Sequence, residues 1–180
     1  MTRTNKPTAS RSKRDTRPTG VRESVASYDS RPARDRASRR ALFDVNVLIA
    51  LLDADHVHHA RATDWLGMNI APGWASCAVT QNGCVRIMSQ PAYPNAFPTA
   101  QVAARLQVAT RTRHHLWVDA DVSLLDPTRF HTDQLLGHRQ VTDAWLLGLA
   151  VRHELRLVTF DGGIARRVVR SAGPEHIVAI

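Results

Sequence analysis

Short apolar stretches alternate with segments of helical spacing along residues 41–180, and this alternation restricts the fold more than any other feature. Neighbouring parallel strands need a long crossover connection, which is usually a helix. The sequence therefore predicts an α/β fold with a central, mostly parallel sheet flanked by helices. The predicted strands cover residues 41–44, 74–78, 116–118, 156–159 and 176–179. The predicted helices cover residues 45–52, 56–68, 80–89, 98–110, 142–151 and 162–171.

Polar residues stand at the ends of the apolar stretches or shortly after them. They are Asp44, Gln81, Asp143 and Asp161. The ends of parallel strands meet along one edge of a sheet, so residues far apart in sequence can converge there. Carboxylates crowded at one place repel each other unless a cation neutralises them. We therefore expect the three acids to form a pocket for Mg²⁺ or Mn²⁺, which suits metal-assisted hydrolysis of phosphodiesters.

The same residue types also have ordinary structural roles. Asp44 and Asp143 can serve helix starts, and Asp161, which precedes two glycines, can form a turn.

Three neighbouring side chains can support the acids by hydrogen bonding. Asn46 follows Asp44 by two residues and can orient it as a metal ligand. Thr142 and Thr159 stand close to the other two acids in the sequence. Capping of the helix at 142–151 by Thr142, and strand packing by Thr159, are the alternative interpretations.

The positive charge of the chain lies in its first 40 residues. They contain 12 Lys and Arg against 4 Asp and Glu, so their net charge equals the +8 of the whole chain. This segment has no Leu, Ile, Phe or Trp and cannot bury enough apolar surface to fold. We predict a disordered basic tail over residues 1–39 and one domain over residues 40–180. A solvated extension is the favoured interpretation of the tail, and a basic arm that attracts nucleic acid is the alternative.

The sequence also bears on the compartment. No apolar stretch suits a signal peptide or a membrane span. Cys77 and Cys84 form no CxxC pair, which is typical of buried thiols in a reducing compartment. We therefore predict a cytoplasmic protein without membrane contact.

The histidines His56, His58 and His59 look at first like a metal-binding cluster. Asp53 and Asp55 lie just upstream, but no other residue at suitable spacing completes a zinc set. We interpret this segment as the polar start of a helix.

Five segments, in order, resemble the PIN-domain family, specifically the VapC-type toxin ribonucleases of toxin–antitoxin pairs. They are Leu42–Leu52, His56–Leu66, Thr80–Arg86, Gly137–Leu147 and Leu157–Gly163. The resemblance covers residues 41–180 and leaves the tail outside. It implies a three-layer, PIN-like α/β fold with a Mg²⁺- or Mn²⁺-dependent endoribonuclease site. It also implies tRNA or ribosomal RNA as substrate, a cognate VapB-type antitoxin as partner, and a homodimer.

The resemblance assigns roles by position. Asp44, Asp143 and Asp161 match the first, third and fourth acids of the family. Arg86 matches a basic residue that often follows the second motif and could contact phosphate, although a surface arginine would look the same. At the second acid the usual Thr-Glu-Asn-Gly is replaced by Thr-Gln-Asn-Gly, so Gln81 stands where a glutamate is expected. An amide can offer an oxygen to a site but carries no full charge and cannot act as a base.

Gln81 leaves more than one outcome open. Metal binding could be weaker with activity retained, Asp119 or Asp121 could replace the missing acid, or the nuclease could be inactive. The alternative function is a degenerate, non-cleaving PIN-like module that binds RNA or an antitoxin. A nuclease directed at DNA is a third hypothesis, which the short domain without a visible helical-arch insertion disfavours.

Overall fold

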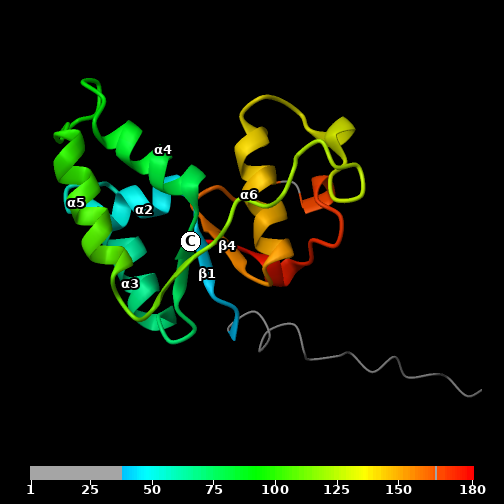
Figure 1. The fold of residues 1–180 in the computed structure, drawn as a ribbon, viewed down its shortest axis with the longest axis horizontal. Coiled ribbons are helices and arrows are strands. Elements are labelled where there is room, and N and C mark those ends of the chain that lie inside the picture. The colour runs from blue at the N-terminus through cyan, green and yellow to red at the C-terminus, as the bar shows by residue number, and fades with distance from the viewer. Residues whose placement is uncertain (1–37, 165) are drawn as a thin grey trace, which may run out of the picture.

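The computed structural model describes residues 38–164 and 166–180, which form an α/β fold around one five-stranded sheet (Figure 1). The predicted disordered tail falls almost entirely outside the described residues. Within the described part, every helix is too short or too polar to cross a lipid bilayer.

All five strands of the sheet run parallel, which confirms the predicted fold class and makes the sheet entirely parallel. The strands are β1 (Ala41–Phe43), β2 (Trp74–Ser76), β3 (His115–Trp117), β4 (Arg156–Thr159) and β5 (Ile177–Ala179). Their order in the sheet is β3-β2-β1-β4-β5. From β1 the chain adds β2 and β3 on one side. It then returns to the other side of β1, where it adds β4 and β5. In open α/β sheets, ligands bind in the crevice at such a reversal, which here lies between β1 and β4.

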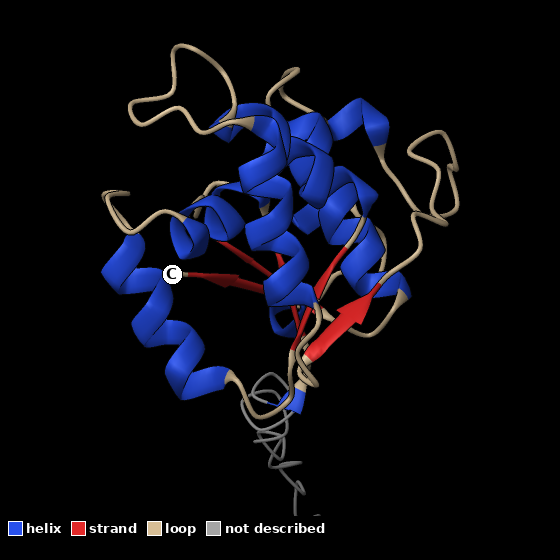
Figure 2. Cartoon of the chain, turned by 60° about the vertical axis from the view of Figure 1, so that its left-hand side comes forward, coloured by secondary structure: helices blue, strands red, loops and turns tan. Residues whose placement is uncertain are grey.

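Helices cover both faces of the sheet. Figure 1 shows α2, α3, α4 and α5 on one side of the strands and α6 on the other, and Figure 2 shows the strands enclosed by these helices. The helices are α2 (Val45–Leu52), α3 (His59–Asn69), α4 (Ala78–Met88), α5 (Thr99–Thr110) and α6 (Gln140–Arg152).

Two hydrophobic cores form because successive strand residues point to opposite faces of the sheet. Leu42 and Leu157 pack with α6, whereas Phe43, Trp74 and Val158 pack with the helices of the other layer. Each strand carries apolar residues on both faces, as buried parallel strands do. The strands β1, β2 and β4 are buried along their whole length, whereas β3 and β5 are partly exposed. The residue after β1 consequently emerges at an edge held on both sides by packed helices.

The predicted last helix, over residues 162–171, is wrong. The described residues of this segment form turns and a short 3₁₀ helix, η2 (Arg166–Val168). Asp161 Oδ1 accepts a hydrogen bond from the Gly163 backbone N at 2.6 Å, which closes a turn where a helix would have begun. At the other end Ser171 has a φ of 63°, a left-handed conformation that ends the segment.

Two helices also begin earlier than predicted. The helix α4 starts at Ala78 after the N-cap Cys77, so Thr80 is its third residue rather than its cap. Thr80 Oγ1 accepts a hydrogen bond from the Cys77 backbone N at 3.0 Å, as in a capping box. The helix α6 starts at Gln140, which places Thr142 inside the first turn and not at the cap predicted for it.

Candidate active site

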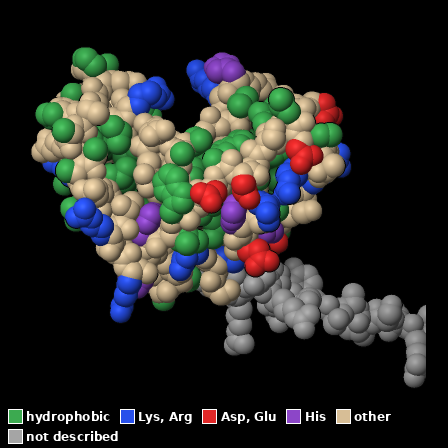
Figure 3. Space-filling view, in the orientation of Figure 1, with side chains coloured by type: hydrophobic (Ala, Val, Ile, Leu, Met, Phe, Trp, Pro, Cys, Tyr) green, Lys and Arg blue, Asp and Glu red, His purple; other side chains and the backbone are tan. Residues whose placement is uncertain are grey.

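A cavity of about 510 Å³ opens between the start of α2, one face of α4 and the first turn of α6. It lies in the region where Figure 3 shows a notch in the molecule, with Lys or Arg side chains on both rims. Asp44 and Asp143 both line this cavity. Two acids separated by about a hundred residues in sequence are therefore neighbours, at the reversal of strand order.

Asp44 directly follows β1 and is fixed there by two hydrogen bonds. It is only 6% exposed and caps α2, with Oδ1 accepting from the Val45 backbone N at 2.6 Å. Its other oxygen, Oδ2, accepts from Thr159 Oγ1 at 3.1 Å, and Thr159 Oγ1 in turn accepts from the Asp161 backbone N at 3.0 Å. Burial raises the pKa of Asp44, the two hydrogen bonds oppose the rise, and the negative charge of Asp161 adds to it.

Asp143 enters the cavity from the first turn of α6. Partial burial raises its pKa to about 6, and repulsion from Asp44 and then from Asp161 adds to the effect. No salt bridge among the described residues involves any of these three acids. The cavity thus brings together carboxylates that form no ion pair with any described residue.

Asp161 stands beside the cavity rather than in it. It is exposed, does not line the cavity, and gives Oδ1 to the turn at Gly163. Its charge nevertheless raises the pKa of both Asp44 and Asp143. We expected three acids in one pocket. The structure instead places two carboxylates at one cavity, and the third acts on them by electrostatic repulsion from outside it.

The donor set fits a hard divalent cation. No group of three His, Cys, Asp or Glu residues in the described chain is arranged as a complete metal site. Mg²⁺, however, is commonly held by one or two carboxylates and keeps several waters, so Asp44 and Asp143 suffice as protein ligands. The raised pKa of each acid is consistent with cation binding, because a cation stabilises the charged form of a carboxylate that burial and repulsion destabilise.

Gln81 does not face the acids. Its Nε2 donates to Ser76 Oγ at 2.9 Å, and Ser76 Oγ lies 2.9 Å from Nε2 of His115. Gln81 lines a different cavity of about 290 Å³, between α4 and α5. Asn82 lines both cavities, and Gly83 lines the acid cavity. Asn82 is therefore the α4 residue with a side-chain amide in the lining of the acid cavity.

Helical spacing could have revealed this arrangement. The α4 residues in the cavity include Val79, Asn82, Gly83 and Arg86, which share one face at intervals of three and four. Gln81 and Arg86 are five residues apart on the same helix, so both cannot point at one site.

Of the three residues predicted to support the acids, one bonds an acid and two only line the cavity. Thr159 bonds Asp44. Asn46 and Thr142 line the cavity, but the hydrogen bonds described for Asp44 go to Val45 and Thr159 rather than to Asn46.

Two acids that could have replaced the missing one are engaged elsewhere. Asp119 accepts from Trp117 Nε1 at 2.9 Å, and Asp121 lies 2.7 Å from His153 Nε2 and 3.5 Å from Arg152 Nε. Neither lines the acid cavity. The structure therefore gives no support to either replacement.

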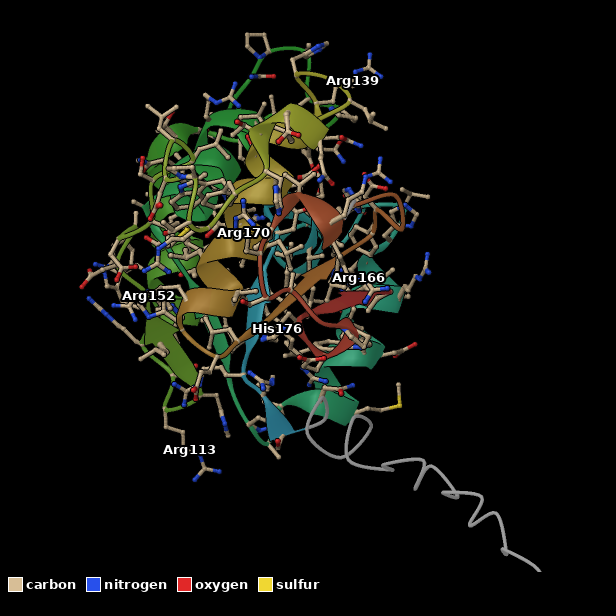
Figure 4. The ribbon with its side chains drawn as sticks, turned by 90° about the vertical axis from the view of Figure 1, so that its right-hand side faces the viewer. Arg113, Arg139, Arg152, Arg166, Arg170 and His176 are labelled. Atoms are coloured by element: carbon tan, nitrogen blue, oxygen red, sulfur yellow. The ribbon has the colours of Figure 1, made fainter. Side chains whose placement is uncertain are left out.

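One arginine lines the acid cavity, and others stand on elements that adjoin the acids in the chain. Arg86 lines the cavity, and Arg139 stands one turn before Asp143 on the same face of α6. Figure 4 shows Arg139 close to the start of α6 and Arg166 on η2, beyond the turn that follows Asp161. None of these arginines takes part in a salt bridge between described residues. Sequence reasoning missed Arg139, although its spacing from Asp143 was a usable signal.

Comparison with known proteins places these features in a family. The PIN domain model matches residues 41–169. Ribonuclease VapC44 of Mycobacterium tuberculosis is 50% identical over 141 residues, which cover 78% of this chain and 99% of that protein. Ribonuclease VapC38 of the same organism is 45% identical over 126 residues, which cover 69% and 86%. The crystal structure of Mycobacterium tuberculosis VapC20, a sarcin–ricin loop cleaving toxin, aligns with a TM-score of 0.49 at 14% identity, covering 69% of this chain and 92% of that one.

Proposed function

This chain belongs to the PIN-domain family and to its VapC-type ribonucleases, and from that premise we propose that it is a metal-dependent endoribonuclease, the toxin of a toxin–antitoxin pair. The observation that carries the proposal is the meeting of Asp44 and Asp143 in one cavity that Arg86 also lines. Carboxylates for a cation beside a guanidinium for a phosphate are what phosphodiester hydrolysis requires.

In this proposal Asp44 and Asp143 hold Mg²⁺ or Mn²⁺. A cation there would offset charge on the phosphodiester and lower the pKa of an attacking water. Thr159 keeps Asp44 oriented through its hydrogen bond at 3.1 Å. Arg86 binds a phosphate oxygen, and Arg139 attracts the RNA strand to the opposite rim. Asp161 strengthens the attraction for the cation from outside the cavity.

The partners follow from the same family membership. We propose a VapB-type antitoxin as inhibitor, structured RNA such as tRNA or ribosomal RNA as substrate, and a homodimer as the assembled form. The uncompensated acids offer an antitoxin a place for a basic side chain, because a carboxylate pair in a half-buried cavity binds guanidinium well.

The test of this function is RNA cleavage by the purified chain in MgCl₂ or MnCl₂ across a pH series. We expect cleavage that EDTA abolishes, and single-stranded DNA of the same sequence left intact. Protons compete with the cation for Asp143, whose pKa is raised to about 6. Metal affinity should therefore fall by up to about tenfold per pH unit below that value. Cleavage that persists in EDTA, or RNA left uncut in both metals, would contradict the proposal.

A second candidate function is a binding module that does not cut. It is favoured by the absence of a third or fourth carboxylate from the cavity lining.

Two single substitutions in α4 separate the candidates. Asn82→Asp adds a carboxylate to the acid cavity, so it should tighten Mg²⁺ binding by about tenfold, whereas Gln81→Glu should change it little. Calorimetric titration with MgCl₂ measures both. A larger effect of Gln81→Glu would show that Gln81 turns toward the acids after all. A non-cleaving parent that gains activity only with Asn82→Asp would identify the binding module.

A further inference from the structure

Three aromatic rings gather beside the end of β4. The ring of His58 lies 4.6 Å from that of Phe160 and 5.7 Å from that of His56, and the His56 ring is stacked at 6.5 Å from Phe160. All three side chains are partly exposed. Val57, between the two histidines, is 85% exposed and extends the apolar surface.

This ring cluster of His56, His58 and Phe160 adjoins the active site through β4. Phe160 is flanked by Thr159, which bonds Asp44, and by Asp161, whose charge acts on both cavity acids. Phe160 packs with the core on the α2 side of the sheet, and Val45 and Ile87 of the same core line the cavity. A nucleic-acid strand whose phosphate occupies the cavity would cross the end of β4 and bring its next base to the rings.

The segment that carries the histidines is held rigid before any ligand arrives. Asp53, only 4% exposed, accepts from Tyr93 Oη at 2.6 Å and from the Asp55 backbone N at 3.1 Å. The His58 backbone N donates to Nδ1 of His56 at 3.1 Å, which fixes the His56 ring. Rings fixed in advance bind a flat partner at little cost in conformational entropy.

Neither metal binding nor core packing accounts for the two histidines. No set of three His, Cys, Asp or Glu side chains among the described residues is arranged to hold a metal ion. Burial lowers the pKa of His56, and the neighbouring His58 lowers it further, while the charge of Asp53 opposes the shift. The side chain of His58 makes no capping bond to α3, so the helix does not need it.

We propose that His56, His58 and Phe160 form a stacking site for an unpaired RNA base next to the phosphodiester in the acid cavity. The proposal rests on the proposed ribonuclease function. Proteins bind unpaired bases by stacking them on His, Phe, Tyr or Trp rings, and RNA loops present such bases. The site thereby selects single-stranded or looped RNA over duplex RNA, because a paired base cannot reach the rings.

The test uses His58 variants of the full chain and an RNA oligonucleotide that carries 2-aminopurine, with binding measured in EDTA. His58→Ala should weaken binding by about tenfold and reduce the quenching of 2-aminopurine, because one stacking surface is lost. His58→Phe keeps a ring and should restore both, whereas His58→Lys introduces a positive charge without a ring and should not. His114→Ala, a partly buried histidine at the opposite edge of the sheet, is the matched control and should bind like the parent.

Several outcomes would overturn the stacking site. One is unchanged binding in His58→Ala and in Phe160→Leu, with thermal melting showing that both are folded. Another is rescue by His58→Lys but not by His58→Phe, which would mean a charge contact. A third is intact RNA binding combined with weakened antitoxin binding, which would assign the rings to a protein partner. The binding assay in EDTA does not depend on cleavage. A chain that fails to cut RNA therefore contradicts the ribonuclease function, and unchanged binding in the ring variants contradicts the stacking site.

Discussion

An Asp143→Asn variant is expected to fold normally and to cut RNA at least about 100-fold more slowly than the parent. Asparagine has nearly the same shape but no charge, so the cavity keeps one of its two carboxylates and holds a cation much less tightly. The initial rate of RNA cleavage in MgCl₂ measures the loss. Two matched variants serve as comparisons for this loss of cleavage rate. Asp161→Asn, outside the cavity, should lose less of the rate than Asp143→Asn, and Asp64→Asn, on the exposed face of α3, should cut at the rate of the parent.

The same variant has a signature in stability that does not depend on catalysis. The pKa of Asp143 is raised to about 6 from an ordinary value of 3.8, so the folded metal-free protein binds a proton more readily than the unfolded chain. Protonated Asp143 contributes to the free energy of unfolding below pH 3.8, and this contribution is lost as the pH rises through about 6. After allowance for solvent screening, the loss is on the order of 1 kcal/mol. Asp143→Asn should lack this loss, and full activity of the variant would remove Asp143 from the proposed site.

A Phe43→Ala variant is expected to lose about 3–5 kcal/mol of the free energy of unfolding. Phe43 is fully buried, stacks on Trp74 with ring centroids 5.6 Å apart, and meets Trp65 edge-on at 6.1 Å. Removal of the Phe43 ring would leave a cavity in the core on the α2 side. Phe43 directly precedes Asp44 in the chain. Urea unfolding at constant pH measures the change.

Two comparisons make the Phe43 result specific. Leu136→Ala removes an apolar side chain that is 75% exposed and should change stability by less than about 0.5 kcal/mol. Phe43→Leu fills part of the space and should cost less than Phe43→Ala. Equal losses in all three variants would mean that the stacked rings contribute little to the core.

The strands and most helices could be predicted because their apolar patterns are local and regular. The stretch at 156–159 reads as buried on both faces and forms β4 at those residues. The order of the strands could not be read in this way, because β4 returns to the far side of β1 and nothing local to either strand specifies that pairing.

The meeting of Asp44 and Asp143 in one cavity was predictable, but the arrangement of the other candidate residues was not. Asp44 and Asp143 follow from their places at a strand end and a helix start. Gln81 was expected at the site by its match to a family position, yet the rotation of an α-helix turns it away from Asn82 by about 100°. Asp161 precedes two glycines, and the turn that they favour takes its carboxylate away from the cavity and replaces the helix predicted there.

The bond between Thr159 and Asp44 joins residues 115 positions apart in the chain. During synthesis β1, β2 and β3 emerge from the ribosome first, while Thr159, the partner that orients Asp44, is made after all three. The acid pair therefore cannot be completed until α6 and β4 have left the ribosome and β4 has docked beside β1. An enzyme proposed to cut RNA would then remain inert until β4 has docked beside β1.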